Sequence, residues 1–371
     1  MTLTTQRDLA RHTVDAIAGA PPAEFTVAPT NAEEVMSILS LASAHRLTVL
    51  VWGGGTHQGY GYRVDPDVVL STQRLAGVVD WEPDDLTVVV AGGTRIDQLE
   101  HVLAERGQSA VLLEEEGPAT VGGVVAAGVS GWRRSRYGPV RDRLLEVSLV
   151  TGDGRPVRAG GRVVKNVTGF DLCRLTAGSF GRLGVIVEVC LKLWPHGRAS
   201  ATVRVDSAED ALARAHRPLA VIEENGAATC FLQGTQGEVD SQAAALGGDF
   251  QPGLEWPQRL SAPICWSLRV PPASTRAAVE MVPSGWRYQA QFGVGEIGLG
   301  SEAPDLDEAA RIRRWAESLG GALVLSNAPA ALYEEIDPWG TPPPAGDIQR
   351  RLVERFDPER VLNPGRLPGR L

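Results

Sequence analysis

Successive glycines directly after an apolar run are the feature that most constrains this chain. The run LTVLVW is typical of a buried strand and leads into GGGTHQGYG, so that residues 51–61 contain five glycines. Glycine leaves the main chain uncovered, and successive uncovered N–H groups form a concavity suited to an anionic diphosphate. A tight turn between two strands is the alternative, and this stretch alone leaves both interpretations open.

Two familiar phosphate-binding loops can be tested by their spacing, and both fail. The Rossmann pattern G-x-G-x-x-G needs a glycine where Gln58 or Thr56 stands. A P-loop needs Lys and then Ser or Thr where Tyr60 and Gly61 stand. Any phosphate site in this stretch must therefore use another loop geometry.

Composition excludes several classes of protein. A chain of 371 residues with 43% hydrophobic content can bury large cores and most simply forms two domains. Its net charge of -9 gives no basic footprint, so we expect no nucleic-acid partner. The N-terminal stretch has no continuous apolar core and no window is long enough to span a bilayer, so we expect a cytoplasmic protein without direct membrane insertion.

Cysteine and histidine spacing argues against a metal site. The four cysteines, Cys173, Cys190, Cys230 and Cys265, lie far apart without any C-x-x-C pair, which disfavours a local zinc or iron–sulfur site. The six histidines never pair at i, i+2 or i, i+4. We expect no metal in this chain.

Periodicity divides the chain into three parts. Residues 24–108 alternate β-rich runs with helices, and the first helix begins at Thr30 or Asn31. Residues 199–325 give two βαββα units in succession, which resemble a doubled ferredoxin-like α+β domain. A proline-rich linker, DPWGTPPPAG, precedes the final helix. We expect domains at 1–198 and 199–345, with residues 346–371 packing back on the first.

Three further stretches leave backbone amides free to meet a ligand. They are GPATVGGVVAAGVSGWRRSRYG at 117–138, VVKNVTGFDL at 163–172 and LTAGSFGRLGVIVEV at 175–189. Each could be an ordinary loop if taken alone. Their combination and order are more specific than any one of them.

In this combination the chain resembles the FAD-binding family of the vanillyl-alcohol oxidase or p-cresol methylhydroxylase (PCMH) type. The likeness covers residues 24–197 and the C-terminal stretch FDPERVLNPGRL. It implies a two-subdomain PCMH-type FAD-binding domain with a reduced ferredoxin-like cap, α+β overall. By the same resemblance the residues expected to bind FAD are Gly53, Gly54, Gly55, Thr56, His57, Gly59, Pro118, Thr120, Gly122, Gly123, Tyr137, Gly178, Ser179, Gly184, Val185 and Ile186.

The resemblance also bears on how FAD is held. Several family members attach flavin covalently through a histidine in the first loop, and Gly55 occupies that position here. We therefore expect non-covalent FAD. Trp52 replaces an arginine common in the family, which puts the charge of the loop in question. Lys165 is a candidate cation beside the flavin, with a solvated lysine as the alternative.

The reduced cap resembles that of the family's glycolate-oxidising complexes, which implies an FAD-binding subunit. Related single-chain 2-hydroxy-acid dehydrogenases carry a histidine-rich metal motif in this domain, whereas residues 199–345 contain only His216. The expected partners are a sister flavoprotein subunit and an iron–sulfur subunit, through which the chain would reach the inner membrane. A stand-alone FAD-dependent alcohol oxidase and a non-catalytic assembly subunit are the alternatives.

Overall fold

The computed structural model describes residues 9, 11–114, 117–162 and 170–371. The N-terminal part contains a parallel sheet in the order β1 (Phe25–Val27), β3 (Val68–Ser71), β2 (Val49–Trp52). Helix α2 (Ala32–His45) begins where the side chain of Asn31 accepts from the N–H of Glu34. Its apolar face buries Val35, Ile38, Leu39 and Ala42, as the periodicity predicts.

A second, antiparallel sheet stands beside the first and contributes another core to the N-terminal part. Its order is β4 (Val78–Glu82), β5 (Thr87–Ala91), β9 (Val185–Lys192), β7 (Leu144–Val150), β8 (Pro156–Gly160). Around it lie α3 (Ile96–Ala104), α4 (Val121–Ala127), α5 (Arg134–Tyr137), η1 (Val140–Asp142) and α6 (Leu172–Thr176), and the short pair β6 (Gln108–Ser109) and β10 (Trp194–Pro195).

The cap is one eight-stranded antiparallel sheet made of two like halves. Its order is β14 (Phe250–Pro252), β11 (Ala199–Val205), β13 (Ala227–Gly234), β12 (Ala220–Glu224), β16 (Arg287–Phe292), β17 (Glu296–Ser301), β15 (Ile264–Arg269), β18 (Ala322–Asn327). Numbered within each half, both read 4-1-3-2, the ferredoxin-like order, and the halves join through β12 and β16. This confirms the doubled ferredoxin-like cap that the sequence predicts.

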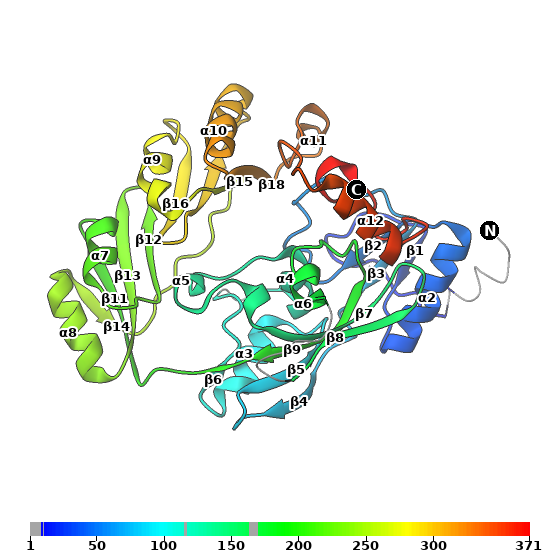
Figure 1. The fold of residues 1–371 in the computed structure, drawn as a ribbon, viewed down its shortest axis with the longest axis horizontal. Coiled ribbons are helices and arrows are strands. Elements are labelled where there is room, and N and C mark those ends of the chain that lie inside the picture. Colours follow the sequence, from blue (N-terminus) through cyan, green and yellow to red (C-terminus); the bar gives the residue numbers. More distant parts are fainter. Residues whose placement is uncertain (1–8, 10, 115–116, 163–169) are drawn as a thin grey trace.

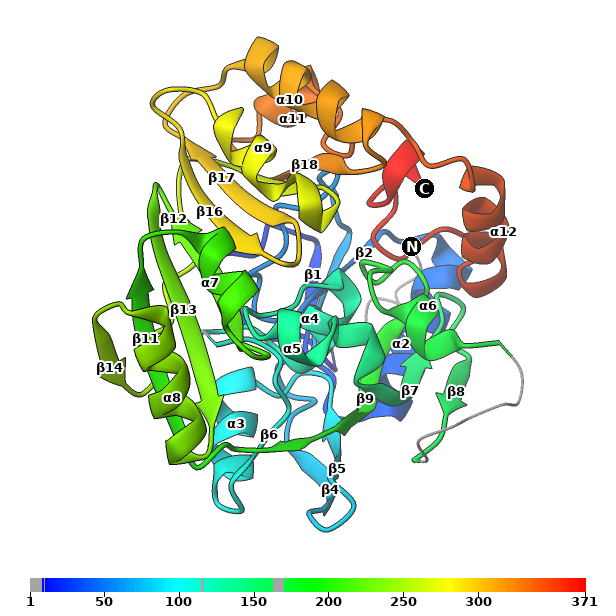
Figure 2. The same cartoon turned by 60° about the vertical axis from the view of Figure 1, so that its left-hand side comes forward.

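Helices cover the outer face of the cap sheet, and its inner face turns toward the N-terminal part (Figures 1 and 2). They are α7 (Ala208–Arg214), α8 (Gln236–Leu246), η2 (Pro272–Ser274), α9 (Thr275–Glu280) and α10 (Leu306–Ser318). The sequence predicts α8 only over 241–246. It begins earlier because Thr235 and Glu238 form a capping box that starts the helix at Gln236.

The C-terminal segment leaves the cap and returns to the first sheet (Figure 1). It comprises α11 (Leu332–Glu335), α12 (Gly346–Phe356) and η3 (Pro368–Arg370). The N–H of Val49 donates to the carbonyl of Val361 at 2.8 Å, and the N–H of Asn363 donates to the carbonyl of Val49 at 2.8 Å. The tail thus lies beside β2, at the start of the glycine loop. None of the described helices has the length and apolar composition that crossing a bilayer requires.

Candidate functional site

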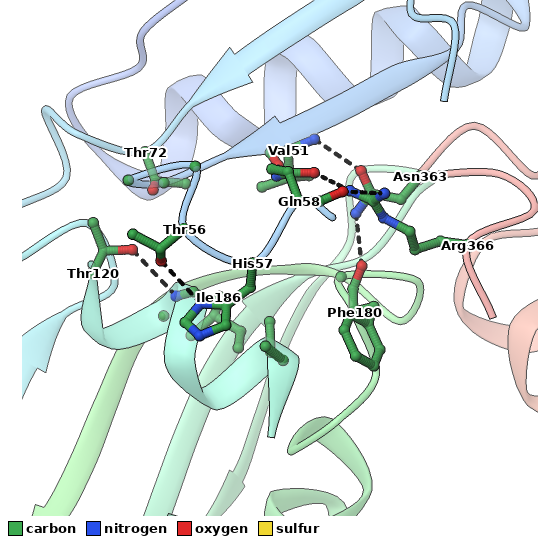
Figure 3. A pocket seen from close by; sticks show the side chains of 18 of the residues that line it. Val51, Thr56, His57, Gln58, Thr72, Thr120, Phe180, Ile186, Asn363 and Arg366 are labelled. Carbon is green, nitrogen blue, oxygen red and sulfur yellow. Dashed lines mark hydrogen bonds between the residues drawn. The ribbon is translucent and has the colours of Figure 1, made fainter. Parts of the chain in front are cut away.

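A groove with about 680 Å³ of free space lies between the two sheets of the N-terminal part. Figure 3 shows four segments meeting around it: the glycine loop after β2, the start of α4, the turn before β9 and the C-terminal tail. The lining residues are Val51, Gly53, Gly54, Gly55, Thr56, His57, Gln58, Thr72, Thr120, Gly122, Gly123, Ala126, Ala127, Phe180, Gly181, Gly184, Ile186, Asn363 and Arg366.

The glycine loop can follow its path because residues 53–55 carry no side chains. A Cβ on Gly54 would overlap the carbonyl of Pro118, and one on Gly53 would overlap the side chain of Thr120. Gly55 has a φ of 76°, a left-handed conformation that glycine adopts without strain. The loop therefore packs directly on the segment before α4, and its main chain forms one wall of the groove.

The opposite wall comes from the turn before β9. Phe180 has a φ of 50°, which is unusual for a bulky side chain. Two hydrogen bonds hold it: its N–H donates to the carbonyl of Ala126 at 2.8 Å, and its carbonyl accepts from Nδ2 of Asn363 at 2.9 Å. Gly181 and Gly184, which lie between Phe180 and β9 in the chain, also line the groove. The conformation of Phe180 is thus fixed by two neighbouring segments.

The C-terminal tail supplies the polar side chains that tie these walls together. Oδ1 of Asn363 accepts from the N–H of Val51 at 2.9 Å, so this one amide joins β2 to the Phe180 turn (Figure 3). Arg366 donates to the carbonyls of Gln58 at 3.0 Å and Tyr62 at 3.1 Å. The tail fixes the far end of the glycine loop through these bonds.

The groove carries positive charge. Arg366 is 5% exposed, and burial lowers the pKa of its guanidinium to about 10, so it stays protonated at neutral pH. Burial also lowers the pKa of His57 to about 4, with repulsion from Arg259 adding to the effect, so that His57 is neutral. No Asp or Glu is among the lining residues. A buried cation beside uncovered main chain favours an anionic ligand.

Ten of the residues predicted to bind FAD line this groove: Gly53, Gly54, Gly55, Thr56, His57, Thr120, Gly122, Gly123, Gly184 and Ile186. The remaining predicted residues lie elsewhere. Pro118 and Ser179 are next to lining segments, Gly59 faces the carbonyl of Ser326, and Val185 is buried in the core beside β1–β3.

Two of the predicted residues belong to other cavities. The ring of Tyr137 packs edge-on against Trp194, with centroids 5.3 Å apart, in a cavity beside α3. Gly178 lines a cavity on the far side of Phe180. Lys165 falls outside the described residues.

Sequence reasoning missed nine of the lining residues: Val51, Gln58, Thr72, Ala126, Ala127, Phe180, Gly181, Asn363 and Arg366. Asn363 and Arg366 lie within the FDPERVLNPGRL stretch, where polar side chains beside an Asn-Pro-Gly turn were a usable signal. Their distance along the chain from the glycine loop hides the contact.

Comparison with known proteins bears directly on this groove. The FAD binding domain family matches residues 23–160, which include the glycine loop and α4. Glycolate oxidase subunit GlcE of Escherichia coli (strain K12) is 30% identical over 343 residues, covering 86% of this chain and 93% of that protein. The chain belongs to the PCMH-type FAD-binding family.

One further relative matches about half of the chain, and one solved structure matches most of it. D-lactate dehydrogenase of Archaeoglobus fulgidus is 32% identical over 189 residues, covering 50% of this chain and 42% of that protein. The solved structure of an alkyldihydroxyacetonephosphate synthase superposes with a TM-score of 0.68 over 92% of this chain and 76% of the other, at 14% identity. That likeness shows a shared fold.

FAD is the cofactor of this family, and the groove suits it. The diphosphate needs uncovered amides and a cation, which the Gly53–Gly55 segment and Arg366 provide. This confirms the predicted family, fold and cofactor, and with them an FAD-dependent oxidoreductase.

Proposed function

We propose that this chain is the FAD-carrying subunit of a complex that oxidises glycolate or a related 2-hydroxy acid and passes the electrons to partner subunits. The similarity to GlcE along nearly its whole length carries the proposal. The second glycolate oxidase subunit among the relatives, GlcD of Bacillus subtilis, is 30% identical over 186 residues and represents the expected sister flavoprotein. An iron–sulfur subunit would then accept the electrons from the flavin subunits.

The residues of the groove would hold the cofactor in defined roles. Backbone N–H groups of the glycine loop bind the diphosphate, Arg366 neutralises its charge, and Asn363 keeps the two walls in register. Bound FAD supplies a two-electron acceptor for the carbon that bears the hydroxyl group. Oxidation of glycolate to glyoxylate removes two electrons and two protons, and the electrons then leave for a partner.

Three of the cysteines are buried thiols that are poorly suited to bind a metal. Cys173, Cys190 and Cys230 are each buried, and burial raises the pKa of their thiols to about 11, 11 and 12. Such thiols stay protonated at neutral pH, and a protonated thiol binds metals poorly and reacts slowly. Among the residues that the structure describes, no cluster of His, Cys, Asp and Glu forms a metal site.

A stand-alone alcohol oxidase remains a second candidate because of one cavity. A space of about 590 Å³ between the FAD-binding part and the cap is lined by Tyr60, Trp132 and Arg259, among others. Arg259 lies over the Trp132 ring at 4.9 Å and donates to the carbonyl of Ser130 at 2.7 Å. A small alcohol could be held here without a metal.

Purifying the chain by itself and together with its expected partner subunits distinguishes these functions. We expect the isolated chain to bind FAD without oxidising glycolate, and the chain co-expressed with GlcD-like and iron–sulfur subunits to reduce an artificial acceptor when glycolate is added. Turnover of an alcohol by the isolated chain would favour the second candidate. A chain that binds no FAD at saturating cofactor would leave an assembly role and contradict the proposal.

A further inference from the structure

A second cavity adjoins the FAD groove. It has about 980 Å³ of free space and lies between the segment from α4 to η1, strand β15 and the C-terminal segment. Phe180 and Ala127 line both the cavity and the FAD groove, so these two residues form part of the wall between them. A ligand in this cavity would therefore lie next to whatever occupies the groove.

Three arginines line this cavity and no carboxylate does. Arg134 donates to Oε2 of Glu296 at 2.7 Å, and Arg269 is the register partner of Glu296 across β15 and β17. Glu296 thus pairs with Arg134 and lies on the strand next to Arg269. Arg141 has a carboxylate of Asp142 at 4.0 Å, on an exposed pair that contributes little. The cavity has an excess of positive charge.

The remaining wall is aromatic. The rings of Tyr60 and Phe180 have centroids 5.9 Å apart, and those of Phe180 and Trp339 are 5.1 Å apart. Left-handed backbone at a bulky residue such as Phe180 is strained, and such strain is concentrated at ligand sites. The strained Phe180 places its ring as the partition between this cavity and the FAD groove.

We propose that this cavity binds a small organic carboxylate, with Arg269 and Arg141 as its cationic contacts and Phe180 separating it from the FAD groove. Guanidinium groups bind carboxylates through paired, charge-assisted hydrogen bonds, and the aromatic wall excludes water from one side of the ligand. The proposal rests on the proposed function in one respect: beside bound FAD, the carboxylate would be that of the 2-hydroxy acid itself.

Oxalate, a two-carbon dicarboxylate that cannot be oxidised as a hydroxy acid, tests the site. We expect it to bind the FAD-loaded protein at low ionic strength, seen as heat in calorimetry and as a change in the flavin absorbance, whereas its neutral analogue oxamide does not. Arg269→Gln and Arg141→Gln should each weaken oxalate binding by about tenfold or more, the loss of one charge-assisted contact. Arg287→Gln, on β16 of the same sheet and outside the lining, should leave it unchanged.

The flavin content of each variant separates this inference from the alternatives. Equal binding of oxalate and oxamide to the wild type, or unchanged oxalate binding in both variants, would overturn the proposal. Loss of FAD from Arg269→Gln with an unchanged melting temperature would overturn it too, because these arginines would then belong to the FAD site. Oxalate binding that depends on Arg269, together with a co-expressed complex that does not reduce the artificial acceptor when glycolate is added, would support this site and count against the proposed function.

Discussion

Arg366 is the residue on which the charge of the FAD groove depends. Its guanidinium is buried, and its hydrogen bonds go to neutral carbonyls of Gln58 and Tyr62. The diphosphate would be its charged partner. We expect Arg366→Gln to weaken FAD binding by about ten- to a hundredfold, the range of a charge-assisted hydrogen bond.

Fluorescence quenching on titration with FAD measures that change. Arg350→Gln, an exposed arginine paired with Asp347 on α12, is the matched control and should bind FAD as the wild type does. Wild-type affinity in a folded Arg366→Gln protein would contradict the role of this cation.

Gly54 is the position where a single methyl group should disturb the loop. Its Cβ would overlap the main chain of Pro118, which cannot move away as a flexible side chain could. We expect Gly54→Ala to lower FAD affinity by at least tenfold. Gly237→Ala, in α8 with open space around the added Cβ, should retain FAD and stabilise the fold by up to about 1 kcal/mol.

His57 gives the apoprotein a pH dependence of known sign. Its pKa is about 4 in the folded state, against about 6.5 when unfolded, so the unfolded chain binds more protons between these values. The contribution of neutral His57 to the free energy of unfolding is fully present above pH 6.5. It falls by about 3 kcal/mol at most as the pH drops toward 4. We expect His57→Gln to lose less stability than the wild type over this window in urea unfolding. Parallel pH profiles would show that His57 is not shifted.

At the scale of elements, the C-terminal tail is held by a buried ion pair. Arg182 donates to Oδ2 of Asp357 at 2.8 Å, and the two side chains are 1% and 0% exposed. The N–H groups of Val361 and Leu362 donate to the same carboxylate at 2.9 and 3.0 Å. This cluster sets the path of the chain just before Asn363 enters the groove.

Removing one partner of this pair should affect both stability and cofactor binding. Asp357→Asn leaves Arg182 buried without its counter-charge, a change that costs about 3–5 kcal/mol. We expect lower stability in urea and weaker FAD binding, because the tail positions Asn363 and Arg366. Asp347→Asn, on the exposed face of α12, is the control. A destabilised protein with wild-type FAD affinity would show that the tail does not shape the site.

Element prediction from the sequence succeeded where the signals are local. The cap at Asn31 and the apolar face of α2 follow from neighbouring residues, and so do the two cap halves. Long-range contacts were harder. Tyr137 stands near α4 in sequence, but its ring packs on Trp194 in a different cavity, and Arg366 reaches the glycine loop only because β2 pairs with the tail.

The whole molecule is a two-sheet FAD-binding part, a doubled cap and a tail that returns to the groove (Figure 2). The sequence could predict this arrangement because the glycine-rich turns and the repeated βαββα order are each distinctive in the chain. It could not predict the cavity behind Phe180, since three separate segments, none with a motif of its own, form its walls.

The central claim is that this chain binds FAD reversibly in the groove between its two N-terminal sheets. An absorption spectrum of the purified protein after incubation with FAD, followed by acid precipitation, tests it directly. The account predicts a flavin spectrum on the native protein and all of the flavin in the supernatant after precipitation. A colourless protein, or flavin that stays with the pellet, would contradict it.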